Sequence, residues 1–176
     1  MTTCEPFEDD RRALEGGRAG VDAAGRGAAG ATRSPVPEGG AVVVPRHAYN
    51  GTVGLMQDAA RRGRLEVREV DVSRPNALVD AAEGAAMVWI ESPTNPALEV
   101  VDIAETAAAA RTRGALVVVD NTFATPLVQQ PLALGADVVV HSATKLLAGH
   151  SDALAGVAVV ADDPTYELLE AYRRLH

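Results

Sequence analysis

Short runs of consecutive apolar residues alternate with longer mixed stretches along most of the chain. Apolar runs of this length, bounded by Gly, Pro or Asp, indicate strands that are buried on both faces of a sheet. The predicted strands are Ala41–Val44, Leu65–Val70, Ala85–Ile90, Leu116–Val119, Asp137–Val140 and Ala155–Val160. The predicted helices are Val53–Arg62, a helix capped by Ser73, Ile103–Thr112, Pro126–Leu134 and Pro164–Leu175. This alternation predicts an α/β fold with a mostly parallel sheet covered by helices on both faces.

The N-terminal part of the chain departs from this pattern. Pro6–Glu15 can form a short helix that the following pair of glycines would end. From Arg18 to Pro37 the sequence is dominated by Gly and Ala with scattered Arg, so it offers little apolar surface to bury. We therefore expect this stretch to be weakly ordered, residues 1–36 to be an irregular N-terminal segment, and residues 37–176 to form one domain.

Composition narrows the classes of function. The 176 residues are 47% hydrophobic, which is enough for one compact domain. A formal charge of −8 and a pI near 4.9 oppose attraction to nucleic-acid phosphates and to anionic lipid. No apolar stretch approaches the roughly 20 residues that span a bilayer, and residues 1–10 lack the pattern of a signal peptide. We expect a cytoplasmic protein with no nucleic-acid or membrane partner.

Two segments place polar chemistry directly after apolar runs. They are Val117–Thr122, which contains Asp120, and Val138–Lys145. In an open α/β sheet the carboxyl ends of the strands face the ligand crevice, so an acid after one strand and a lysine just past the next can meet at one ligand. This pairing suits pyridoxal phosphate, because a lysine holds its aldehyde as a Schiff base and a carboxylate keeps its ring nitrogen protonated.

Several motifs in the order of a known family strengthen this interpretation. They are Glu91–Pro96, Val119–Phe123, Pro131–Asp137, Ser142–Lys145 and Gly149–Asp152. Together they resemble the Cys/Met-metabolism pyridoxal-phosphate enzymes, the family of cystathionine γ-synthase, the cystathionine lyases and methionine γ-lyase. The resemblance implies the aspartate-aminotransferase-like fold (fold type I), whose large domain has three layers, α/β/α. It also implies a small amino-acid substrate and a homo-oligomer, either a dimer or a tetramer.

The resemblance gives roles to the residues around the predicted ring. Lys145 would bond to the cofactor aldehyde and then move the α-proton of the substrate, a task for which it must be buried beside cationic or apolar groups. Asp120 would pair with the pyridinium nitrogen, Asn95 would hydrogen-bond the phenolic oxygen, and Thr122 would lie against the ring. The alternatives are a surface cation for Lys145, a helix N-cap for Asp120 and a simple Pro-Thr-Asn-Pro turn for Asn95.

The resemblance also gives roles to two hydroxyls and one aromatic ring. Ser142 and Thr144 would hold the cofactor phosphate, and Tyr49 would stack on the ring and shuttle protons. Alternatively, the two hydroxyls satisfy nearby backbone groups and Tyr49 belongs to a generic core. The Ser-Gly-Met turn whose backbone amides grip the phosphate in the family has no counterpart between Arg18 and Pro37.

Two hypotheses about function follow. The first is a pyridoxal-phosphate-dependent transsulfuration enzyme of sulfur amino-acid metabolism, which carries out γ-replacement or elimination on cystathionine or activated homoserine. The second arises because family subunits are much longer and carry a C-terminal substrate-binding domain that has no counterpart here. In that case the chain is a truncated, non-catalytic remnant that only binds cofactor or pairs with a full-length subunit.

Two other patterns point to different chemistry. Gly25–Gly30 matches the dinucleotide fingerprint, but no apolar strand precedes it and no acid follows at the required distance, so we do not expect a nicotinamide enzyme. His141, His150 and Asp152 suggest a metal site, but their spacing is unlike that of a helical His pair. We expect structural or solvated histidines and no metal.

Overall fold

The computed structural model describes residues 12–23, 27–150 and 152–175. Its strands are β1 (Ala19–Ala23), β2 (Gly40–Pro45), β3 (Leu65–Val70), β4 (Met87–Glu91), β5 (Leu116–Asp120), β6 (Val138–His141) and β7 (Gly156–Val160). Its helices are α2 (Gly27–Ala31), α3 (Asn50–Arg61), α4 (Ala77–Ala81), α5 (Ile103–Thr112), α6 (Thr125–Val128) and α7 (Asp163–Leu175). All the predicted strands are present, with ends within two residues of those expected.

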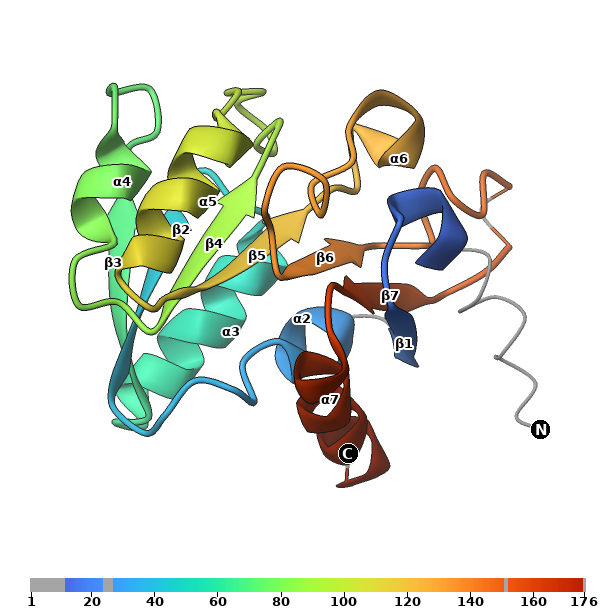
Figure 1. Cartoon of the computed structure of the whole chain (residues 1–176), viewed down its shortest axis with the longest axis horizontal. Helices are drawn as coiled ribbons and strands as arrows, with labels where there is room; N and C mark the ends of the chain where they lie inside the picture. The colour runs from blue at the N-terminus through green and yellow to red at the C-terminus, as the bar shows by residue number, and fades with distance from the viewer. Residues whose placement is uncertain (1–11, 24–26, 151, 176) are drawn as a thin grey trace.

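The described strands form a single seven-stranded sheet in the order β1-β7-β6-β5-β4-β2-β3. The neighbouring strands β3, β2, β4, β5 and β6 pair in parallel, whereas β7 is antiparallel to both β6 and β1. The carboxyl ends of β4, β5 and β6 therefore point to the same edge, and β7 returns in the opposite direction (Figure 1). The predicted mostly parallel sheet is confirmed.

Helices cover both faces of this sheet and complete the three layers (Figure 1). On one face, Leu78 of α4 and Ala107 of α5 pack on the strand valines, among them Val119. On the other face, Met56 of α3 and Leu169 of α7 pack around Trp89, Met87 and further strand residues. The central strands are apolar throughout because each of their side chains enters one of these two cores. The predicted three-layer α/β/α fold is confirmed.

The prediction of an irregular N-terminal segment is wrong for much of that segment. Residues 12–15 are helical, which agrees with the end of the predicted Pro6–Glu15 helix, while residues 6–11 lie outside the described residues. β1 then pairs along its whole length with β7, and α2 packs on β6, β7 and α7. Strand pairing uses backbone groups, so β1 forms without the apolar run that a sequence pattern detects.

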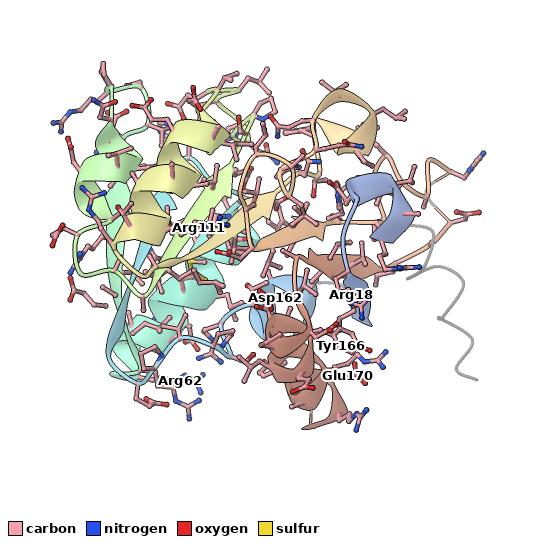
Figure 2. The ribbon with its side chains drawn as sticks, viewed as in Figure 1. Arg18, Arg62, Arg111, Asp162, Tyr166 and Glu170 are labelled. Carbon is pink, nitrogen blue, oxygen red and sulfur yellow. The ribbon has the colours of Figure 1, made fainter. Side chains whose placement is uncertain are left out.

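The junction between β1 and α7 is held by charge as well as by packing. Arg18 Nε donates to Asp163 Oδ1 at 2.9 Å, although both side chains are largely exposed and the pair adds little stability. Figure 2 labels Arg18, just before β1, and Tyr166 and Glu170 on α7, the helix that packs on β1.

No helix in the described part of the chain is long and apolar enough to cross a membrane.

Two predicted helices differ from those observed. Ser73 does not cap a helix, because its backbone N–H and its hydroxyl both bond to Asp71 Oδ1 and form a turn. Helix α4 starts only after Asn76, which has a left-handed backbone conformation. Helix α6 ends at Val128 because Gln129 becomes extended and its side chain bonds to neighbouring loops.

Candidate active site

A cavity of about 860 Å³ opens at the carboxyl edge of β4, β5 and β6. Its walls also include the start of α3 and two alanines of α2. The residues that line it are Ala28, Ala29, Tyr49, Thr52, Glu91, Pro93, Asn95, Asp120, Thr122, Phe123, Val140, His141, Ser142, Thr144, Lys145, Leu146, Gly149 and Leu154. All the site residues predicted from the sequence are in this set, so the fold brings them together from separate segments of the chain.

Asp120 and Thr122 form the floor of the cavity after β5. The hydroxyl of Thr122 donates to Asp120 Oδ1 at 2.5 Å, and the backbone N–H of Thr122 donates to the same oxygen at 3.0 Å. The hydroxyl oxygen of Thr122 also accepts the backbone N–H of Ser142 at 2.9 Å, which ties the β5 loop to the β6 loop. Asp120 is therefore held in place by two donors before any ligand binds.

The charge of Asp120 depends on opposing effects. Burial raises the pKa of its carboxyl above the ordinary value. The two hydrogen bonds from Thr122 and the nearby His141 act in the opposite direction, because they favour the ionised form. A cationic group bound beside Asp120 would add a further, strong preference for the carboxylate.

The two predicted phosphate-binding hydroxyls differ in availability. Thr144 Oγ1 donates to the backbone oxygen of Ala155 at 3.2 Å and accepts the backbone N–H of Ala155 at 3.0 Å. No described residue hydrogen-bonds the hydroxyl of Ser142, which faces the same cavity. In this arrangement Thr144 serves the backbone, as the alternative interpretation expected, and Ser142 is the hydroxyl left to donate to a phosphate.

Lys145 lies one residue after Thr144 and is the only lysine among the 176 residues. Its side chain lines the cavity, but the residue is exposed. The expected burial beside cationic or apolar groups is therefore not present in this structure. The reason is local: Lys145 lies in the loop between β6 and β7, where Leu146 and Leu154 are exposed as well.

Glu91 is a cavity residue to which the sequence analysis gave no role. It ends β4, pairs in register with Asp120 of β5, and is only 4% exposed. Its two carboxyl oxygens accept the backbone N–H groups of Tyr49 at 2.8 Å and of Asn95 at 2.9 Å. Burial and the negative charge of Asp120 raise the pKa of Glu91 to about 8. A polar residue directly after an apolar run was the available signal, since the same pattern identified Asp120.

A second buried network lies beneath the cavity and was also missed. His141 Nε2 lies 2.5 Å from Glu15 Oε1, and Asn121 Nδ2 donates to the same oxygen at 2.9 Å. All three residues are buried. The network joins the N-terminal helical turn to the ends of β5 and β6, which are 106 and 126 residues away in sequence. No local sequence pattern reports such a contact.

The two other patterns do not build sites among the described residues. His141 is buried against Glu15, whereas His150 is exposed, which agrees with structural and solvated roles. No group of three or more His, Cys, Asp or Glu side chains in the described ranges is placed to hold a metal ion. A strand, β1, precedes the Gly25–Gly30 pattern, but it contains no apolar run and is an edge strand antiparallel to its neighbour. A dinucleotide site uses a parallel βαβ unit instead.

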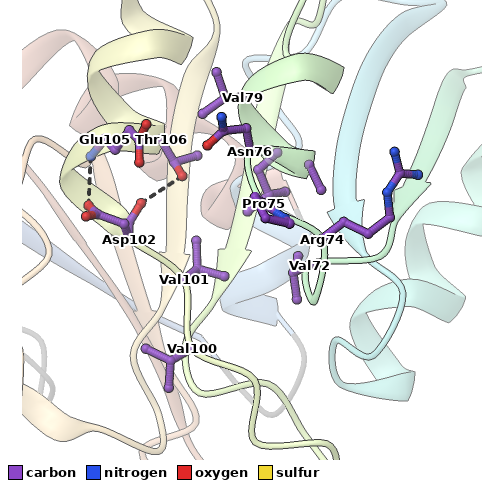
Figure 3. Close-up of a pocket in the computed structure, with 12 residues that line it drawn as sticks. Val72, Arg74, Pro75, Asn76, Val79, Val100, Val101, Asp102, Glu105 and Thr106 are labelled. Atoms are coloured by element: carbon purple, nitrogen blue, oxygen red, sulfur yellow. Dashed lines mark hydrogen bonds between the residues drawn. The ribbon is translucent and has the colours of Figure 1, made fainter.

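A smaller hollow of about 280 Å³ lies between α4 and α5 (Figure 3). Two of its polar residues are already bonded at the start of α5: the side chain of Asp102 accepts the backbone N–H of Glu105, and the backbone oxygen of Asp102 accepts the hydroxyl of Thr106. None of the site residues expected from the sequence lines this hollow, so the large cavity is the candidate active site.

The chemistry of the cavity fits pyridoxal phosphate. Lys145 supplies an amine for an aldehyde, Asp120 supplies an anion for a cationic ring nitrogen, and Ser142 supplies a hydroxyl for a phosphate. The half-exposed ring of Tyr49 supplies an aromatic face. This is the donor set that the resemblance in the sequence implied.

Comparison with known proteins agrees with this geometry. The family model described as "Cys/Met metabolism PLP-dependent enzyme" matches residues 2–174. A cystathionine β-lyase of Coxiella burnetii is 42% identical over 155 residues, which cover 86% of this chain and 40% of the relative. A cystathionine γ-synthase of Escherichia coli is 51% identical over 127 residues, 72% of this chain and 33% of the relative.

Solved structures give the same result. Cystathionine γ-synthase from Xanthomonas oryzae pv. oryzae, in complex with aminoacrylate and cysteine, superposes with a TM-score of 0.92 at 35% identity. The alignment covers 97% of this chain and 45% of that structure, so the chain spans less than half the length of the proteins it matches. Because the family model matches nearly its whole length, the chain belongs to the Cys/Met metabolism PLP-dependent enzyme family.

Proposed function

We propose that this chain is the cofactor-binding part of a pyridoxal-phosphate-dependent transsulfuration enzyme of sulfur amino-acid metabolism. The observation that supports this most is the meeting, in one cavity, of the sole lysine with Asp120, Asn95, Ser142 and Tyr49. These side chains come from the ends of different elements, so their convergence is a property of the fold and not of one local motif.

Each residue has a task that its position allows. Bound pyridoxal phosphate supplies an electron-accepting ring. Asp120, already held by Thr122, would keep the ring nitrogen protonated, and Asn95 would hydrogen-bond the phenolic oxygen. Lys145 would hold the aldehyde carbon and carry the proton of the substrate's α-carbon. Ser142, and Thr144 if its hydroxyl leaves Ala155, would bind the phosphate. Tyr49 would stack on the ring and shuttle protons.

The substrate class follows from the relatives. They are named cystathionine β-lyase, cystathionine γ-synthase and methionine γ-lyase, and this chain matches all of them. We therefore propose γ-replacement or elimination on cystathionine or on activated homoserine. The competing proposal is a non-catalytic remnant that only binds cofactor or pairs with a full-length subunit. The two proposals differ in whether the chain turns over substrate, not in whether it binds cofactor.

The sole lysine makes cofactor binding simple to test. Purified protein incubated with pyridoxal phosphate should develop the visible absorbance band of a lysine-bound cofactor, and borohydride reduction should fix the label on the peptide that contains Lys145. Lys145→Ala should lose both signals, since it removes the only lysine of the chain. A labelled wild-type chain that turns over no sulfur amino acid would favour the remnant. Equal labelling of the variant would contradict the proposed site.

Association with a second subunit is part of the proposal. Leu127 and Val128 of α6 are 88% and 82% exposed, and Leu146 and Leu154, which line the cavity, are exposed as well. Large apolar side chains with this much exposure are typical of a surface that another protein covers. Sedimentation velocity should detect dimers or tetramers, and Leu127→Glu should weaken them more than Leu168→Glu on α7. A monomer at every concentration would contradict this part.

A further inference from the structure

We propose that Glu91 is a positioning residue whose carboxylate holds the backbone amides of Tyr49 and Asn95 together, and thereby fixes the two side chains that flank the cavity. Each carboxyl oxygen accepts one of these amides, at 2.8 Å from Tyr49 N and 2.9 Å from Asn95 N. The two amides belong to different segments: one precedes α3 and the other follows β4. One side chain therefore fixes the spacing of two walls.

The fold explains why this position needs a carboxylate. β4 lies between β2 and β5, so the end of β4 is next to the segment that leaves β2 toward α3. The side chain of Tyr49 makes no capping hydrogen bond at the start of α3, and the backbone N–H of Tyr49 turns back to Glu91. A carboxylate has acceptor sites on two oxygens and can serve both amides, whereas an amide side chain has only one acceptor oxygen.

The charge of Glu91 is set by its neighbours. The other titratable side chains that line the cavity are Tyr49, Asp120, His141 and Lys145. Outside the cavity, Glu99 lies on the same loop as Asn95, and its carboxylate pairs with His47. Asp120 is the neighbour that opposes ionisation of Glu91, and it is also the residue proposed to meet the ring nitrogen. A cation beside Asp120 would therefore favour the charged form of Glu91 and strengthen both amide contacts.

A positioning role for Glu91 differs from a merely structural role in one measurable respect. If Glu91 only fills space, the amide chemical shifts of Tyr49 and Asn95 should not change when the carboxyl of Glu91 loses its proton. If it holds both amides, their chemical shifts must change together with the carboxyl shift of Glu91 as pH rises through neutrality, because the hydrogen bonds strengthen when the carboxyl ionises.

The first experiment uses the protein without cofactor. NMR spectra of isotope-labelled protein are recorded against pH, following the carboxyl carbon of Glu91 and the amides of Tyr49 and Asn95. We expect one shared midpoint in the wild type and no such transition in Glu91→Gln. Glu83→Gln, on an 82% exposed side chain, should leave the transition unchanged. Different midpoints in the wild type overturn the inference, and this comparison needs no variant to fold.

The second experiment rests on the proposed function. The dissociation constant for pyridoxal phosphate is measured by absorbance titration in the wild type, Glu91→Gln and Glu83→Gln. Loss of one amide contact should weaken binding about 10-fold in Glu91→Gln, while the band itself remains because Lys145 is intact. Equal affinity in all three proteins overturns the inference and leaves the proposed function standing. Absence of the band in the wild type contradicts the proposed function, and the NMR result still decides the role of Glu91.

Discussion

The buried carboxyl of Glu91 should make the stability of the protein fall as pH rises. Its pKa is about 8 in the folded chain, against 4.5 as the ordinary value. Between these values the folded state binds more protons than the unfolded state, so the free energy of unfolding decreases with pH and levels off above the folded pKa. The full effect is at most about 5 kcal/mol, of which about 2 kcal/mol falls between about pH 6 and pH 8.

Glu91→Gln removes this titration while keeping the shape of the side chain. Urea denaturation at a series of pH values should give a flatter profile for Glu91→Gln than for the wild type, with the difference near 2 kcal/mol over the interval of about pH 6 to pH 8. Burial also raises the pKa of Asp120, which gives both proteins a pH dependence of the same sign. Glu83→Gln is the matched control. Parallel profiles for wild type and Glu91→Gln would refute the reasoning.

Two further substitutions test the polar contacts around the cavity. Glu15→Ala leaves the buried His141 and Asn121 without their shared acceptor, and we expect it to lower the free energy of unfolding by about 3 kcal/mol in urea denaturation. A loss below that of a surface control such as Glu83→Ala would count against the network. Thr122→Val removes the hydroxyl bonded to Asp120, so carboxyl NMR should report a higher pKa for Asp120; an unchanged or lower value would argue against that bond.

The sequence was sufficient for the parts of the fold that depend on local pattern. Apolar runs such as Val117–Val119 enter the two cores directly, so their positions predict the central strands. Polar residues that follow such runs reach the ligand edge, which placed Asp120 and Lys145 in one cavity. The family motifs added Tyr49 and Asn95 by resemblance, and the fold then brought them to the same walls.

Features that depend on distant pairing were not predictable in this way. β1 has no apolar run and is stabilised by backbone pairing to β7, more than 130 residues later in the chain. The Glu15 contact with His141 spans 126 residues. The exposure of Lys145 depends on which other segments cover its loop. The local sequence around Lys145 carries no information about such tertiary contacts. Ser73 does not cap a helix because its hydroxyl bonds to Asp71 in a turn.

The reversal of direction between β6 and β7 places Lys145 on a hairpin-type connection. The loop closes where His141 pairs with Val157, and Thr144 is joined to Ala155 by one backbone–backbone hydrogen bond and by two hydrogen bonds of the Thr144 hydroxyl. Both ends of the loop are thus anchored on neighbouring strands, and its closing entropy changes only slowly with length. Residues could be added beyond Thr144 without displacing a helix, because no helix lies between β6 and β7. A parallel crossover contains a helix, and an insertion there can displace that helix. The segment that carries the lysine is therefore a part of the cavity wall that can change in length.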